Sequence, residues 1–259
     1  MAQNDTYYTS THLMAVTAAK VLKDNKSVFV GTGLPMIAAM FAQKTHAPNL
    51  LLIFEAGSIG PQMRTLPISV GDSRTGYRAI SISTMHDNMS FSQAGWTDYG
   101  FLGGAQIDQY GNLNTTYIGE SWENPKVRLP GSGGGNDVAS LSHNFIIIMR
   151  QTKRNFIEKV TFITSPGYLD GPGAREKAGL PKDGGPIKVI TQLAVYGFDE
   201  NSKKMKLETI HPGITVDDIR NNSSFDIIIP EDIPTTPIPT RDEVQLLREL
   251  DPTGMAIGK

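Results

Sequence analysis

Residues 27–60 read as a strand, a glycine turn, a helix and a second strand, and this order constrains the fold more than any other stretch. Residues 28–30 are β-branched and aromatic, Gly31 and Gly33 permit a sharp turn, and Pro35 suits the first turn of a helix. Residues 50–54 are continuously apolar, which is typical of a strand buried on both faces of a sheet. The stretch therefore predicts an α/β fold with an open, mostly parallel sheet and helices on both faces.

One acidic residue, Glu55, follows the second of these strands directly. Ligands in open α/β folds bind beyond the carboxyl ends of the strands, so Glu55 is a candidate catalytic residue. A carboxylate at this position could equally cap the next segment or pair with an arginine. The spacing by itself leaves both interpretations open.

The remaining elements fit one domain that spans residues 1–259. We expect a first helix capped by Ser10 or Thr11 and a last helix over 242–250, whose apolar face holds Val244, Leu247 and Leu250. Further strands are expected at 101–108, 145–149, 160–164, 187–195, 205–210 and 225–229. Other expected segments are a loop at 58–72, a lid or helix flank at 81–91, a short helix entry at 216–219 and an extended proline-rich segment at 230–239.

Composition excludes several classes of protein. A net charge of -2 without a basic run gives no reason to expect nucleic acid. The absence of cysteine excludes a disulfide framework, a thiolate metal site and a cysteine nucleophile. No apolar stretch is long enough to span a bilayer, and the first residues do not resemble a signal peptide, so we expect a cytoplasmic protein without membrane contact.

One glycine-rich segment is a candidate for binding, and a second glycine marks a turn. Residues 131–135 contain four glycines, and such a loop exposes successive backbone N–H groups that can hold a negative oxygen. A plain flexible linker is the alternative. Asp108 and Asn112 flank a Tyr-Gly turn and are expected to form it.

Several familiar sites are missing. The five histidines have no metal-ligand spacing, so no metal is expected. No Gly-x-Ser-x-Gly elbow and no Walker loop occur. Arg150, Lys153 and Arg154 form a small basic cluster, which is compatible with a solvated surface or with contact to a phosphate group of a ligand.

Taken together, these motifs resemble the family I CoA-transferases, in particular glutaconate CoA-transferase β subunits, over nearly the full length of the chain. The matching stretches are 30–35, 54–57, 103–108 with 110–112, 131–137, 164–167 with 170–173, and 180–181. The resemblance implies a CoA-transferase-like fold, with Glu55 as nucleophile and Gly133, Gly134 and Gly135 as an oxyanion and CoA-binding loop. It also makes Gly31, Gly33, Gln106 and Asn112 candidates for the substrate pocket. Ala56 departs from the Ser or Asn that often follows the glutamate, and this puts the substrate in question.

The implied reaction needs no bound cofactor, because coenzyme A is a substrate. An ionised carboxylate can attack an acyl-CoA without a general base, and CoA then returns to give an enzyme thioester. A carboxylic acid, glutaconate or a related acid, takes CoA by the reverse steps. The resemblance further implies an α subunit as partner, in an α2β2 assembly. A CoA-thioester hydrolase or ring-opening enzyme on the same fold, and a non-catalytic scaffold subunit, are the alternative interpretations.

Overall fold

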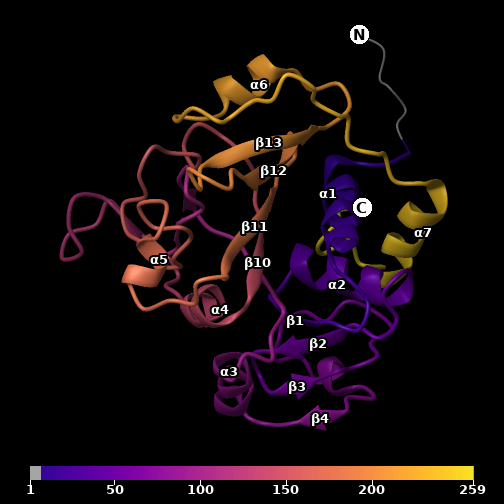
Figure 1. Ribbon diagram of the computed structural model, residues 1–259. Helices are drawn as coiled ribbons and strands as arrows, with labels where there is room; N and C mark the ends of the chain where they lie inside the picture. Colours follow the sequence, from indigo (N-terminus) through magenta and orange to yellow (C-terminus); the bar gives the residue numbers. More distant parts are fainter. Residues whose placement is uncertain (1–6, 259) are drawn as a thin grey trace. The chain divides into compact units, whose positions relative to one another are not determined.

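The computed structural model describes residues 7–258 (Figure 1). Parallel strand pairs form the centre of each half of the fold. The chain divides into two compact units: the residues up to Asn88 with those from Pro237 onward, and Met89–Thr236. The prediction that they form one domain stays a prediction. No helix of the described chain has both the length and the apolar character needed to cross a membrane.

The first unit contains the βαβ arrangement predicted from residues 27–60. Strand β1 (Ser27–Val30) pairs in parallel with β2 (Leu51–Phe54), and helix α2 (Leu34–Lys44) connects them with Pro35 in its first turn. The short strands β3 (Ser58–Ile59) and β4 (Ser81–Ile82) continue the sheet in the antiparallel sense. The loop predicted at 58–72 therefore begins only after β3, because residues 58 and 59 form that strand.

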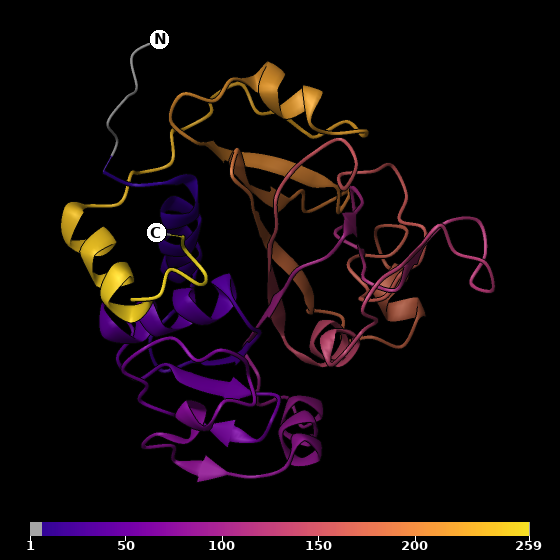
Figure 2. The same ribbon diagram turned by 180° about the vertical axis from the view of Figure 1, so that it is seen from behind.

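Three helices pack together in the first unit (Figure 2). Helix α1 (Ser10–Val21) begins after Thr9, whose hydroxyl accepts a hydrogen bond from the His12 N–H, so the predicted cap at Ser10 or Thr11 was placed too late. Helix α7 (Arg241–Leu250) buries Val244, Leu247 and Leu250, which confirms the predicted apolar face. Helix α3 (Met85–Gln93) and the 3-10 helix η1 (Ser73–Gly76) complete this part, and α3 extends into the second unit.

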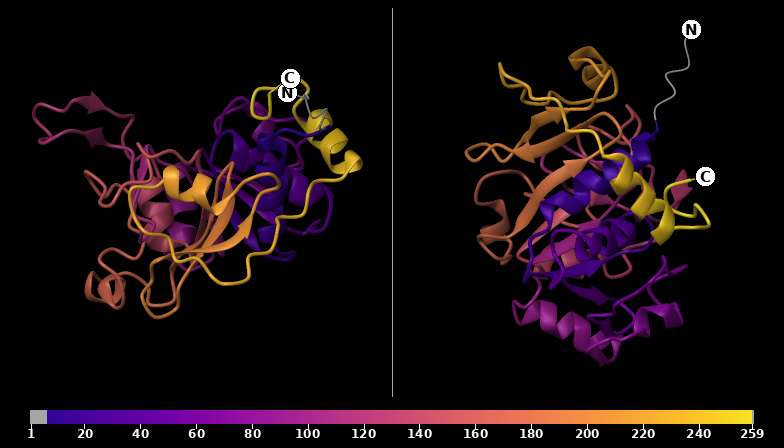
Figure 3. Two further views of the ribbon diagram at one scale, coloured as in Figure 1. Left: turned by 90° about the horizontal axis from the view of Figure 1, so that it is seen from above. Right: turned by 90° about the vertical axis from the view of Figure 1, so that its right-hand side faces the viewer.

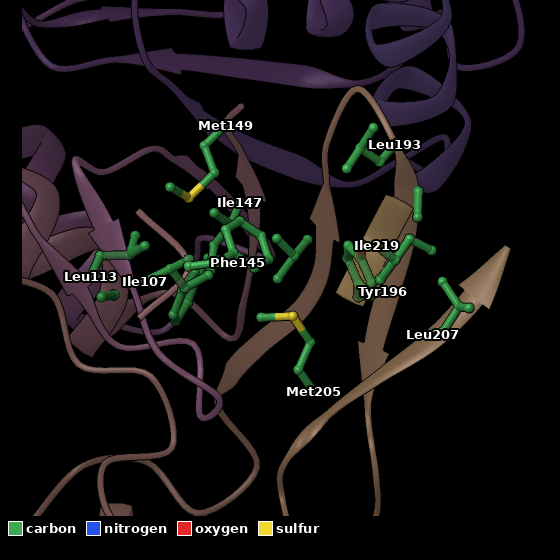
Figure 4. Close-up of a cluster of buried hydrophobic side chains, with 14 residues drawn as sticks. Ile107, Leu113, Phe145, Ile147, Met149, Leu193, Tyr196, Met205, Leu207 and Ile219 are labelled. Atoms are coloured by element: carbon green, nitrogen blue, oxygen red, sulfur yellow. The ribbon is translucent and has the colours of Figure 1, made fainter. Parts of the chain in front are cut away.

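The second unit is built on five strands in the order β13-β12-β11-β10-β5. Strands β5 (Tyr99–Leu102), β10 (Asn144–Ile148) and β11 (Gly185–Ile190) are parallel, whereas β12 (Ala194–Phe198) and β13 (Met205–Ile210) are antiparallel. A cluster of buried apolar side chains from these strands and the loops beside them forms the core (Figure 4). The predicted α/β class is confirmed, with antiparallel strands outside the parallel ones.

Shorter elements complete the second unit. They are β6 (Gln106–Ile107), β7 (Leu113–Asn114), β8 (Tyr117–Ile118), β9 (Val127–Arg128) and the helices α4 (Gly135–Leu141), α5 (Ala174–Lys177) and α6 (Val216–Asn221). The β8–β9 hairpin projects from the rest of this unit as an arm (Figure 3). We call it the hairpin arm.

Four predicted strands were wrong. Residues 101–108 contain the end of β5 and the whole of β6, which lie in different sheets. Residues 160–164 form no strand, because the Thr161 N–H is bonded by the Gln106 side chain rather than by a neighbouring strand. Residues 187–195 are two strands, since the Thr191 hydroxyl accepts the N–H groups of Leu193 and Ala194 and closes a turn. Residues 225–229 contribute only an isolated bridge from Ile228 to Lys206.

Candidate active site

Glu55 lies at the carboxyl end of a buried strand in the first unit. Val30 and Phe54 are paired in the register of β1 and β2, so the turn at Gly31 and Glu55 leave the sheet at the same edge. Gly33, with φ +86°, caps helix α2 and has open space where a Cβ would stand. The structure therefore brings three predicted site residues, Gly31, Gly33 and Glu55, to one edge.

The turn that carries Glu55 is held from both sides. The Phe54 carbonyl accepts hydrogen bonds from the Gly57 N–H at 3.0 Å and from Asn88 Nδ2 at 2.6 Å, and Asn88 is fully buried. Gly57 has φ +117°, and a Cβ there would stand 2.0 Å from the Ser83 carbonyl oxygen. Only glycine fits such a close approach. The sequence reading missed Asn88 because residues 81–91 carried no recognisable pattern.

The Glu55 side chain itself is half-buried, while Ala56 beside it is exposed. Among residues 7–258, no hydrogen bond or ion pair involves the Glu55 carboxylate. A carboxylate that paired with an arginine would be held by the fold, and a capping carboxylate would accept an N–H group. Neither of the two structural interpretations of Glu55 is therefore met within the described chain, and the group is available to a substrate.

The glycine loop belongs to the second unit and runs into helix α4. Gly134, with φ -78°, is the residue before this helix. The Gly135 N–H donates to the Ser132 carbonyl at 2.9 Å, whereas no protein acceptor is found for the N–H groups of Gly133 and Gly134 in the described residues. Gly133, with φ +48°, has open space where a Cβ would stand. Two of the three predicted donors are therefore available.

A chain of polar side chains, of which Thr164, Asn114 and Gln106 are buried, connects to Asn136 in the first turn of α4. Asn136 Nδ2 donates to the Thr164 carbonyl at 2.9 Å, and the Thr164 hydroxyl donates to Asn114 Oδ1 at 3.4 Å. Asn114 Nδ2 in turn donates to Gln106 Oε1 at 2.6 Å. Gln106, 5 % exposed, acts here as a positioning residue, and its predicted contact with substrate stays a prediction.

Asn112 and Asp108 form the predicted turn. One Asp108 oxygen accepts hydrogen bonds from the N–H groups of Tyr110 and Asn112, and Asn112 Oδ1 accepts those of Gly167 and Leu169. Asn112 is 1 % exposed. The turn prediction is confirmed, and these contacts favour a structural role for Asn112 over the predicted substrate contact, which stays a prediction.

Burial raises the pKa of Asp108 to about 6, although hydrogen bonds from Asn112 and neighbouring N–H groups oppose this rise. Because the folded pKa exceeds the usual 3.8, the folded state binds this proton more tightly than the unfolded chain does. Asp108 therefore stabilises the fold most below pH 4, and this contribution falls by roughly 2–3 kcal/mol as pH rises to 6 and above.

We expect Asp108→Asn to remove this decline between pH 4 and pH 6, as measured by urea unfolding of wild type and variant across that range. Asp72 has the opposite pH dependence, because hydrogen bonds from Arg74 lower its pKa. Its stabilising effect is lost only below pH 4, outside the range in which Asp108 titrates. Parallel curves for the wild type and Asp108→Asn would contradict the prediction.

The family of the chain follows from comparison with known proteins. The family model described as Coenzyme A transferase matches residues 11–222, which include Glu55 and the glycine loop. The chain belongs to the coenzyme A transferase family. The resemblance read from the motifs, and the predicted class of enzyme, are therefore confirmed.

Two characterised relatives from this family match almost the whole chain. The β subunit of glutaconate CoA-transferase from Acidaminococcus fermentans is 39% identical over 95% of this chain and 94% of its own length. The β subunit of 3-oxoadipate CoA-transferase from Pseudomonas knackmussii is 38% identical over 94% of each chain. The crystal structure of the Acidaminococcus fermentans glutaconate coenzyme A-transferase superposes with a TM-score of 0.91 and covers 96% of this chain and 97% of that chain.

The basic cluster lies in the second unit. Arg150, Lys153 and Arg154 are exposed, and Lys153 borders an open pocket of about 790 Å³ on the second unit together with Lys204 and Arg220. The exposure of these side chains agrees with the interpretation of the cluster as a solvated surface. Contact of the cluster with a CoA phosphate stays a prediction. No group of three potential metal ligands occurs in the part of the chain that the structure describes.

Proposed function

We propose that this chain is the glutamate-bearing subunit of an enzyme that transfers CoA from an acyl-CoA to a carboxylic acid. The observation that carries the proposal is Glu55, a half-buried carboxylate at a strand end with no partner of its own in the described chain. Membership of the coenzyme A transferase family supports it. The two relatives support glutaconate or a related acid as the CoA acceptor.

The first half of the reaction starts at the Glu55 carboxylate, which is a sufficient nucleophile without a general base. An oxygen of Glu55 attacks the thioester carbonyl, the C–S bond breaks, and an acyl-glutamyl anhydride and CoA thiolate result. The thiolate then attacks the Glu55 carbonyl carbon and expels the donor acid as its carboxylate. Glu55 is left as a CoA thioester, so the activation of the donor is retained.

In the second half an acceptor carboxylate attacks the Glu55 thioester, and the same two steps run in reverse. Each attack places negative charge on a carbonyl oxygen. The N–H groups of Gly133 and Gly134 are the donors proposed for this oxygen, since neither has a protein acceptor in the described residues. Removing one such donor typically lowers turnover by roughly a hundredfold to a thousandfold.

A partner chain is part of the proposal. Both relatives are β subunits of CoA-transferases, and this chain covers almost their full length. We propose that an α subunit supplies the missing surface over Glu55 and that the two assemble as α2β2, because closed symmetric assemblies predominate. A covering surface would keep water from the Glu55 thioester.

The test is the intact mass of this chain after its complex with the α subunit is exposed to acetyl-CoA without an acceptor. We expect a gain of one CoA less one water, which disappears when acetate is added. Rapid conversion of acetyl-CoA to free acetate without this adduct would favour a hydrolase. Neither an adduct nor thioester loss would favour a scaffold subunit.

A further inference from the structure

The hairpin arm and the glycine loop border one pocket in the second unit. Its volume is about 550 Å³, and its walls include Tyr117 and Trp122 of the arm, Phe162, Ile163, Ser132 of the glycine loop and Asn136 in the first turn of α4. We call this the aromatic pocket. All these residues belong to Met89–Thr236, so the pocket lies within one compact unit.

The aromatic side chains of this pocket form a cluster that remains open to solvent. The Tyr117 ring lies 5.8 Å from that of Trp122 and 5.7 Å from that of Phe162. Trp122 is 52% exposed and Phe162 44%, which leaves a large apolar area without a covering group in this chain. Exposed apolar surface of this kind, when hollowed, marks a site for an apolar ligand.

Some of the polar atoms around the pocket are committed to each other. The hydroxyls of Thr116 and Thr164 are 2.7 Å apart, and the Asn136 amide donates to the Thr164 carbonyl. The two amides of a pantetheine arm would need hydrogen-bond partners here. An acyl chain without polar groups needs none, and burying polar groups without hydrogen bonds is costly.

Charge is also absent from the pocket lining. No lysine, arginine or histidine is among the described residues that line it, so a second carboxylate would meet no cation in the pocket wall itself. The nearby Arg128 guanidinium lies over the Trp122 ring, 3.9 Å from its centroid, and Nη2 donates to the Trp122 carbonyl. Arg128 is therefore engaged in holding the arm. A buried carboxylate without a counter-ion would be strongly disfavoured.

The pocket also touches the loop proposed to hold the reacting oxygen. Ser132 and Asn136 stand on either side of Gly133 and Gly134, whose N–H groups have no acceptor in the described part of the chain. A thioester carbonyl oxygen bound there would place the acyl chain and the CoA sulfur, the two groups on the carbonyl carbon, beside the loop. Of these two groups, the apolar acyl chain matches the apolar walls of the pocket.

From this arrangement we infer that the aromatic pocket binds the acyl group of the substrate and selects bulky apolar or aromatic acids over dicarboxylic acids. This inference rests on the proposed CoA transfer, and it replaces glutaconate or a related dicarboxylic acid as the proposed acid substrate. The acids favoured by this chain would then differ from the glutaconate and 3-oxoadipate named for its two relatives.

Binding to an inert enzyme tests the pocket separately from catalysis. The complex of the α subunit with the Glu55→Ala chain is titrated by calorimetry with acetyl-CoA, glutaryl-CoA and 3-phenylpropanoyl-CoA. We expect 3-phenylpropanoyl-CoA to bind at least about tenfold more tightly than acetyl-CoA, because its ring is removed from water. Glutaryl-CoA should bind no more tightly than acetyl-CoA.

Substitution of a pocket residue then locates the effect. Phe162→Ala, added to Glu55→Ala, should abolish most of the preference for 3-phenylpropanoyl-CoA and leave acetyl-CoA affinity within about twofold, since only the longer acyl group reaches the ring. The matched control is Trp96→Ala, an exposed tryptophan of the same unit that stacks on Phe91 and lies outside the pocket. It should leave all three affinities unchanged.

Several outcomes would overturn the inference. One is binding of glutaryl-CoA that equals or exceeds that of 3-phenylpropanoyl-CoA. Another is a Phe162→Ala effect of equal size on all three ligands, and a third is loss of α-subunit association in Phe162→Ala, which would make the aromatic surface a subunit contact. Failure of the proposed function looks different, because the selectivity in binding would persist while the wild-type complex transferred no CoA to any acid.

Discussion

Glu55→Ala and Glu55→Gln are each expected to lower the rate of CoA transfer by at least about a hundredfold, because a covalent mechanism loses its nucleophile. Neither variant should lose much stability, since the Glu55 carboxylate forms no hydrogen bond or ion pair within residues 7–258. Transfer is measured from acetyl-CoA to a panel of carboxylates, and stability is measured by thermal unfolding of the same samples. The effect should therefore appear in turnover and not in the melting temperature.

Two further variants sharpen the interpretation of Glu55. Glu55→Asp retracts the carboxylate by one methylene, and a displacement of about 1 Å can cost roughly a hundredfold in rate. Glu249→Gln removes an exposed carboxylate on α7 of the same unit and should retain full activity. Glu55 would not be the nucleophile if Glu55→Ala or Glu55→Gln kept more than about a hundredth of the wild-type turnover.

The second large effect concerns the partner chain. Expressed alone, this chain should show less than about a hundredth of the transfer rate of its complex with the α subunit, because a thioester on a half-buried Glu55 would be open to water on one side. Size in solution and transfer rate are compared for the chain alone, for the co-expressed pair and for the two chains mixed after separate purification.

Hydrolysis gives this comparison a second measurement. If the chain alone still forms the Glu55 thioester, loss of CoA to water should exceed transfer, and adding the α subunit should reverse that ratio. Should the chain alone form a monodisperse homo-oligomer with full transferase activity, the proposed requirement for an α subunit would be rejected.

The sequence alone was sufficient for the βαβ unit of residues 27–60 and for its carboxylate. Strand, glycine turn and helix start there are each specified by neighbouring residues, from the apolar run at 50–54 to Gly33 and Pro35. The same holds for the Asp108 turn, where the Asp108 carboxylate accepts the N–H groups of Tyr110 and Asn112, and for the apolar face of α7. Local order of this kind is readable because each interaction is made by residues close in the chain.

Tertiary structure decided what depends on distant partners. Residues 160–164 have the composition of a strand, yet Gln106, 55 residues away from Thr161, takes a backbone N–H that a strand would have used. The need for glycine at position 57 comes from the Ser83 carbonyl, and the support of the Glu55 turn comes from Asn88. No local pattern encodes such contacts, because they exist only when the chain brings the two segments together. Propensity therefore predicted where elements could form, and long-range hydrogen bonding and packing determined which of them did.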